Sequence, residues 1–168
     1  MAREVAKAAV LMLPLSVASP VDVGRLIREV SALDDLLLQH DLKGTTEAAK
    51  MPKTTLLLGD MTSLNKLELL VSAQRQQLLK YLNDAKVHAP VLHISFGADP
   101  APSFIEKLMT WLRREIDAQV LITVGLQPNI GAGCLVRSTN KYYDFSLRKD
   151  FDKNRALLMA KLREVVTA

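Results

Sequence analysis

The stretch at residues 130–151, IGAGCLVRSTNKYYDFSLRKDF, decides how the second half of the chain folds. Two short runs rich in β-branched and aromatic residues, at 134–137 and 142–147, flank the polar residues 138–141. Such runs around a polar turn are typical of a β-hairpin. The stretch therefore predicts two antiparallel strands. The basic pair Arg148-Lys149 follows the second strand, and a helical pattern begins directly after it.

Two further strands are expected before the hairpin. Residues 91–96 alternate apolar with polar or smaller side chains, and residues 120–126 are almost continuously apolar. Apolar spacings of three and four predict a helix over 101–116, whose start could use Ser103 and Glu106 as a capping box. A helix between two strands implies that these strands are parallel in a right-handed crossover. The apolar stripe of this helix consists of Phe104, Ile105, Leu108, Met109, Trp111, Leu112 and Ile116.

The chain closes with a helix predicted at residues 152–166. The second half therefore reads strand, helix, strand, strand, strand, helix, and the two helices are expected to cover one face of a four-stranded mixed sheet. The apolar residues of the last helix that are expected to point inward are Leu157, Leu158, Met159, Leu162 and Val166.

The first half is predicted to be a small helical bundle. Ser19 and Pro20 are suited to opening a helix, and Gly44 is suited to ending it. Its apolar stripe consists of Val23, Leu26, Ile27, Val30, Leu33 and Leu37, and Asp34 with Asp35 is expected at a solvated edge. Residues 44–53 read as a loop.

Two more helices are expected in the first half. One spans residues 54–64, and the other spans 73–86 with Ser72 as its cap. Leu78, Leu79 and Leu82 form the apolar side of the later helix. The side chains expected outside it are Gln74, Arg75, Gln76 and Lys80.

The N-terminal residues allow two interpretations. Residues 3–12 could form a short helix, and Arg3 and Lys7 before the apolar run 8–18 also resemble a short secretory signal. Glu4 and Pro14 favour a structural element that buries its apolar face. The whole chain is therefore predicted to be α+β, with a helical domain at 1–88 and a mixed α/β domain at 89–168.

Catalytic, metal and cofactor sites are not expected. The glycines at 131 and 133 precede a strand rather than a helix, so the dinucleotide-binding context is missing, and no phosphate-binding loop motif occurs. His40, His88 and His93 have no metal-ligand spacing, and the single cysteine, Cys134, excludes an intrachain disulfide. We therefore expect no catalytic residue, no metal and no cofactor.

The net charge of +4 leaves one alternative open. Basic residues outnumber acidic ones between Arg137 and Arg163, and Tyr142, Tyr143 and Phe145 are interleaved with them. A small α+β protein could bind RNA with such a segment, through phosphate contacts and base stacking. Acidic residues interrupt the patch, so a hairpin with core-facing aromatic residues and a solvated helix face is the preferred interpretation.

The hairpin resembles a family signature. The matching parts are Ala132-Gly133, the strand that ends at Arg137, the short turn, and Asp144-Phe145-Ser146-Leu147-Arg148 before a basic helix. This sequence is similar to the C-terminal motif of the F-type ATP synthase delta subunit family. This family is called the oligomycin-sensitivity-conferring protein in mitochondria. The family's glycine after the aspartate is Phe145 here, its glycine-containing turn is Thr139-Asn140, and the helical domain is shorter. The chain is thus similar to a divergent member.

The resemblance implies a mechanical role. Proteins of this family sit on the peripheral stalk, or stator, where they hold N-terminal segments of the alpha subunits and C-terminal helices of the b subunits. They link the catalytic head to the b subunits and resist rotor torque, without catalysis and without binding nucleotide or nucleic acid. The location implied is the cytoplasmic face of the cell membrane within the ATP synthase complex, and we favour a bacterial setting.

Two groups of residues follow as candidate sites. The first group carries the motif and is expected to be structural: Gly133, Arg137, Asp144, Ser146 and Arg148. Within it, Asp144 and Ser146 are expected to satisfy backbone donors at the end of the last strand. A groove that could accept a partner helix is expected between two helices of the first half. Its candidate residues are Leu26, Val30, Leu33, Leu37, Leu78 and Leu82.

Overall fold

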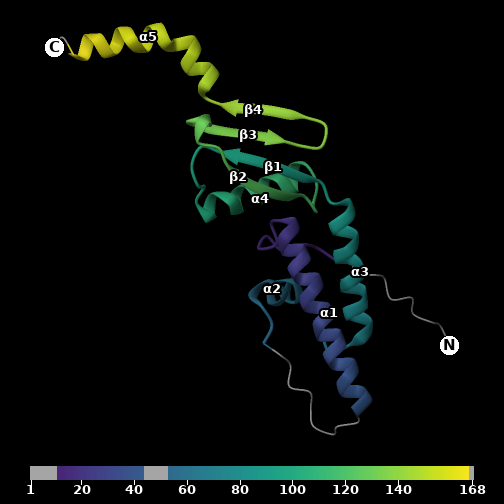
Figure 1. The fold of residues 1–168 in the computed structure, drawn as a ribbon. Coiled ribbons are helices and arrows are strands. Elements are labelled where there is room, and N and C mark those ends of the chain that lie inside the picture. Colours follow the sequence, from purple (N-terminus) through teal and green to yellow (C-terminus); the bar gives the residue numbers. More distant parts are fainter. Residues whose placement is uncertain (1–10, 44–52, 167–168) are drawn as a thin grey trace. The chain divides into compact units, whose positions relative to one another are not determined.

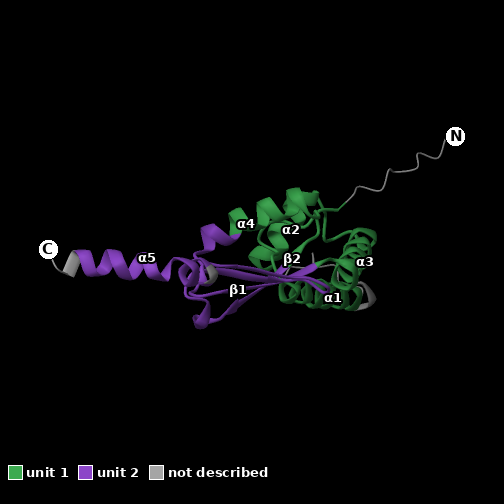
Figure 2. Ribbon diagram, turned by 90° about the horizontal axis from the view of Figure 1, so that it is seen from above, with its two compact units in different colours: residues 1–90, 106–121 green, residues 91–105, 122–168 purple. Residues whose placement is uncertain are grey.

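The computed structural model describes residues 11–43 and 53–166, and the described part confirms the α+β class with helices first and a sheet after them. The chain forms two compact units, unit 1 with residues 1–90 and 106–121, and unit 2 with residues 91–105 and 122–168 (Figure 2). The division predicted at 88/89 would keep the crossover helix in one domain, whereas the two units share it.

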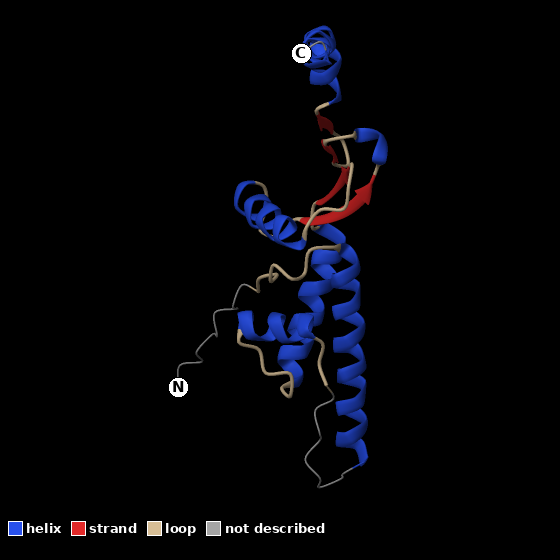
Figure 3. Cartoon of the chain, turned by 90° about the vertical axis from the view of Figure 1, so that its left-hand side faces the viewer, coloured by secondary structure: helices blue, strands red, loops and turns tan. Residues whose placement is uncertain are grey.

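Three helices form most of the described part of unit 1. Helix α1 spans Pro20–Lys43, α2 spans Leu56–Asn65 and α3 spans Ser72–His88. Helices α1 and α3 lie side by side, as Figures 1 and 3 show. Most of the apolar stripe predicted for α1 is buried. The buried members of this stripe are Val23, Leu26, Val30, Leu33 and Leu37.

Helix α1 begins at a reciprocal cap. The Ser19 hydroxyl oxygen accepts a hydrogen bond from the Asp22 backbone N–H at 3.2 Å, and the Asp22 carboxylate accepts from the Ser19 backbone N–H at 3.0 Å. These two bonds satisfy backbone donors that a helix start leaves without partners. The predicted helix start is thereby confirmed.

Helices α2 and α3 begin differently. The Thr55 hydroxyl caps α2 by accepting from the Leu58 N–H, and Glu29 of α1 accepts hydrogen bonds from both the backbone and the hydroxyl of Thr55. For α3 the expectation was wrong by one residue. Val71, which has no side-chain acceptor, precedes the helix, and Ser72 is its first residue.

Four strands form the sheet in the order β2-β1-β3-β4, drawn in Figure 1. Strand β1 spans Val91–Phe96, β2 Leu121–Leu126, β3 Gly133–Arg137 and β4 Tyr142–Ser146. Strand β3 is antiparallel to both of its neighbours. Hydrogen bonds from Leu121 N to Pro90 O and from Gln127 N to Phe96 O have the same sequence offset, so β2 is parallel to β1 as predicted.

The crossover helix α4 spans Pro102–Glu115. The Ala101 carbonyl accepts from the N–H groups of Phe104 and Ile105, so the helix starts before Ser103 and the predicted capping box is not formed. Met109 and Leu112 are the buried residues of α4. Three other members of the predicted stripe, Phe104, Trp111 and Ile116, are each about half exposed.

The last helix, α5, spans Arg148–Val166 and begins earlier than predicted. Every side chain described between Phe151 and Glu164 is exposed, so the expectation that this helix buries an apolar face against the sheet was wrong. The residues expected to point inward remain between 45% and 62% exposed: Leu157, Leu158, Met159 and Leu162. A periodic apolar stripe specifies one face of a helix but not what that face meets.

Three expectations concern residues wholly or partly outside the described part. The short helix at 3–12 falls there except for Leu11 and Met12, which are not helical. Arg3, Lys7 and the first part of the apolar run 8–18, on which the secretory-signal interpretation rests, also lie outside, as does most of the loop predicted at 44–53. Leu11, Leu13 and Val17 are buried in the core of unit 1.

Candidate partner-binding surfaces

The predicted hairpin is confirmed as strands β3 and β4. Gly133 pairs with Ser146 and Arg137 pairs with Tyr142 at its two ends, and the Ser138 N–H donates to the Lys141 carbonyl at 2.8 Å in the turn. Among the described residues other than glycine, only Lys66 has a positive φ. The turn therefore does not use the left-handed geometry that asparagine tolerates.

Gly133 is required by a close backbone approach. Its φ is +88°, and a Cβ at this position would collide with the Phe145 carbonyl oxygen and lie 2.9 Å from the Ser146 Cα. Both contacts are to backbone, which cannot move aside without breaking the β3–β4 pairing. The glycine of the motif thus has a structural role.

Gly133→Ala is expected to lower the free energy of unfolding by about 1–3 kcal/mol, because the substitution combines backbone strain with a collision. Gly59→Ala is the matched control. Gly59 lies within α2, and a Cβ there would meet no atom within 4 Å. This control should raise stability by about 0.5–1 kcal/mol in the same urea titration. Equal effects of the two substitutions would contradict the assigned role.

Asp144 and Ser146 meet where β4 ends. The Asp144 carboxylate accepts a hydrogen bond from the Ser146 backbone N–H at 2.9 Å. The bond satisfies a main-chain donor just before α5 begins, in agreement with the expected structural role.

Asp144→Ala is expected to lower the free energy of unfolding by about 0.5–1.5 kcal/mol, because one backbone donor loses its acceptor. Partner affinity of the folded variant should change less than its melting temperature. Asp152→Ala, an exposed acidic residue on α5, is the control and should change stability by less than about 0.5 kcal/mol. A larger loss of affinity than of stability would make Asp144 a contact residue.

The six residues of the predicted groove lie in the core instead. They are Leu26, Val30, Leu33, Leu37, Leu78 and Leu82, and each is at most 8% exposed. They form the apolar contact between α1 and α3. Facing helices with matching stripes bury those stripes against each other, so no open groove is left along them.

Asp34 and Arg75, both expected at the surface, form a buried ion pair between α1 and α3. Arg75 is 2% exposed, and its Nε lies 2.5 Å from the Asp34 carboxylate. The other Asp34 carboxylate oxygen accepts from the Gln76 side chain at 2.7 Å. Arg75 also donates to the carbonyl oxygens of Leu69 and Leu70, so the pair ties α1, α3 and the segment before α3 together.

Arg113 fastens the N-terminal segment of unit 1 to α4. Its guanidinium donates to the carbonyl oxygens of Leu13, Pro14 and Val17 at 2.6–2.8 Å. Burial lowers the pKa of Arg113 and raises the pKa of the neighbouring Tyr81. These groups are internal to unit 1 and form a structural tie.

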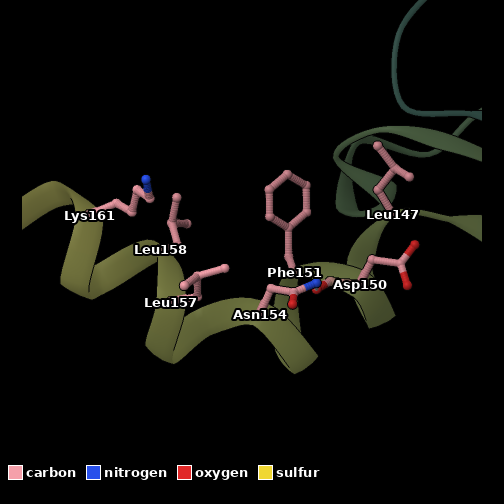
Figure 4. Close-up of a pocket in the computed structure, with 7 residues that line it drawn as sticks. All are labelled: Leu147, Asp150, Phe151, Asn154, Leu157, Leu158 and Lys161. Carbon is pink, nitrogen blue, oxygen red and sulfur yellow. The ribbon is translucent and has the colours of Figure 1, made fainter.

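Helix α5 carries an apolar hollow of about 370 Å³ along one side. Figure 4 shows Leu147, just before α5, and Phe151 and Leu158 of α5 projecting in the same direction, with Lys161 beyond them. Asp150, Asn154 and Leu157 complete the lining. We call this set of seven residues the α5 face. Of these residues, the helical periodicity of the sequence picked out Leu157 and Leu158 but placed them in the core, and it did not include Leu147 or Phe151.

The two faces of the hairpin have different chemistry, because adjacent strand residues point to opposite sides. Tyr143 and Phe145 stack with ring centroids 6.1 Å apart on one face. Tyr142 lies on the other face beside Arg137, its partner on β3. The three aromatic residues of the RNA-binding interpretation therefore do not form one stacking platform. Arg148, the remaining motif residue, is exposed at the start of α5.

Among the described residues, no group of three His, Cys, Asp or Glu side chains could hold a metal ion. Cys134 is half-buried in β3, and burial raises the pKa of its thiol, which disfavours the reactive thiolate. Within the described ranges, no helix is long and apolar enough to cross a membrane.

No protein-family model matches the chain, and no curated protein matches it.

Proposed function

We propose that this protein is a non-catalytic subunit of the peripheral stalk of an F-type ATP synthase. The observation that carries the proposal is the exposed α5 face, because contiguous exposed apolar side chains mark interaction surfaces. The resemblance of the hairpin and its following helix to the delta subunit family supplies the kind of partner. In this role the protein would link the catalytic head to the b subunits and resist rotor torque.

The α5 face suits the C-terminal helix of a b subunit. Phe151 and Leu158 are exposed on the same side of α5, two turns apart, and an apolar partner helix can place anchors at i, i+3, i+4 and i+7 against such a row. Asp150 and Lys161 lie at opposite ends of the face and would select the direction of the partner helix through its charges.

The alpha-subunit contact is assigned to unit 1. The predicted groove is buried, so an alpha N-terminal segment would have to use exposed apolar positions, of which Leu36, Leu38 and Leu56 are examples. In this proposal the protein needs no cofactor, and the complex holds it at the cytoplasmic face of a bacterial cell membrane.

Affinity capture of the tagged chain from its native membranes tests this function. Mass spectrometry should recover ATP synthase alpha, beta and b subunits. Recovery of RNA or ribosomal proteins without any synthase subunit would overturn the proposal in favour of the RNA-binding alternative.

Phe151→Asp is expected to weaken b-subunit binding by at least about 30-fold, because it places a charge at the centre of the apolar contact. Binding of alpha should be retained, since that contact is assigned to unit 1. Ala160→Asp adds the same charge to the opposite side of α5 and is the matched control. Equal loss with both variants, or none with Phe151→Asp, would remove the α5 face as the site.

A further inference from the structure

The polar face of the sheet carries a second hollow, separate from the α5 face. Its volume is about 770 Å³, within the range of small-molecule sites. All of its lining belongs to unit 2: Val91, His93, Ser95, Gln127, Leu135, Arg137, Ser138, Thr139 and Tyr142. We call it the sheet hollow.

Strand register brings the central residues of the sheet hollow together. His93 of β1 lies opposite Arg137 of β3, and Arg137 lies opposite Tyr142 of β4. Directly opposite residues on antiparallel strands point to the same face with Cβ atoms about 4.5–5.5 Å apart. A cation, an imidazole and a phenol ring therefore stand in one row across three strands.

The polar groups of this row are available to a ligand. Within the described part of the chain, the side chains of His93, Arg137 and Tyr142 make no hydrogen bond or ion pair, and neither do those of Ser95 and Gln127.

The charge of the sheet hollow selects an anion. Arg137 lines it and no carboxylate does. The nearest acidic residue along β4 is Asp144, opposite Leu135, and its carboxylate already accepts from the Ser146 N–H. A guanidinium presents paired donors that match phosphate oxygens. The exposed ring of Tyr142 and the aliphatic side chains of Val91 and Leu135 suit a flat, partly apolar group beside that phosphate.

We propose that the sheet hollow binds a small phosphate ester that carries a planar ring, of the mononucleotide class. The single arginine in the lining favours one phosphate group over a nucleic-acid strand, which needs a basic track along its backbone. Gln127 and Ser95 provide the amide and hydroxyl groups that could bond the ring edge or a sugar. This site uses none of the α5 face, and it departs from the family resemblance, which implies that no nucleotide is bound.

Titration calorimetry of the full chain with AMP, inorganic phosphate and adenosine tests the proposal. AMP is expected to bind with a Kd of about 1 mM or tighter, and at least about tenfold more tightly than either fragment, because only AMP uses both Arg137 and Tyr142. Arg137→Met should weaken AMP binding at least about tenfold. Tyr142→Leu should weaken AMP binding while leaving phosphate binding unchanged.

Arg155→Met is the matched control, since Arg155 is an exposed arginine on α5 outside the sheet hollow. It should leave AMP binding unchanged, and circular dichroism should show that all variants are folded. Absence of binding at millimolar AMP, or equal affinity of wild type and Arg137→Met, would overturn the proposal. Binding of single-stranded RNA with no response to AMP would also overturn it and would assign the face to a nucleic-acid strand.

Discussion

Replacing Arg75 by alanine is expected to lower the free energy of unfolding by about 3–5 kcal/mol, the largest effect among the substitutions considered. Arg75 is 2% exposed and donates to the Asp34 carboxylate and to the carbonyl oxygens of Leu69 and Leu70. Its removal leaves a buried carboxylate whose remaining side-chain donor is Gln76. Burying an uncompensated charge is costly, because the protein interior solvates charge poorly.

Urea denaturation followed by circular dichroism measures this change. Lys80→Ala, on the exposed side of α3, is the control and should change stability by less than about 0.5 kcal/mol. The double substitution Asp34→Leu with Arg75→Met removes both charges and should be less destabilising than Arg75→Ala alone. A loss below about 1 kcal/mol for Arg75→Ala would show that the pair is more solvated than its burial indicates.

Arg113→Ala is expected to lower the free energy of unfolding by about 2–4 kcal/mol, because three backbone carbonyl oxygens lose a charged donor. These carbonyls belong to Leu13, Pro14 and Val17, which cross unit 1 without a regular hydrogen-bonded ladder of their own. Arg113→Lys should recover part of the loss, since an ammonium group cannot reproduce the planar fork of a guanidinium.

Arg114→Ala provides the matched control for this prediction. Arg114 is the next residue along α4, its side chain is 72% exposed, and its ion pair is with the adjacent Glu115. Such surface pairs contribute about 0–1 kcal/mol, so melting of this variant should stay close to that of wild type. A similar loss for the two variants would mean that the helix itself, and not the tie to residues 13–17, is being weakened.

The fold was largely predictable from local patterns. Strand β1 matches the alternating run at 91–96, and the hairpin follows from its two β-rich runs around a polar turn. The apolar stripe of α1 was also predicted correctly because helical periodicity depends only on nearby residues. The helix starts at α3 and α4 were less accurate, since several residues near each start could serve as the cap.

The candidate sites were predicted less well than the fold. Gln74, Arg75 and Gln76 look alike in sequence, yet only Arg75 is buried, because it meets Asp34, which lies 41 residues earlier in the chain. The predicted groove became core for the same kind of reason, since the stripes of α1 and α3 face each other. The sheet hollow was not foreseen, because its residues come from separate strands and their loops.

The sequence by itself determined which side chains share a face. The apolar row of α5, the alternation along β4 and the glycine at position 133 all follow from the period of a helix, the period of a strand and a local backbone requirement. Only the tertiary structure decided what each face meets: the α1 stripe is buried, the α5 row meets solvent, and His93, Arg137 and Tyr142 lie opposite one another across three strands. The physical reason is that periodicity acts over a few residues, whereas burial and charge pairing depend on contacts between residues far apart in the chain.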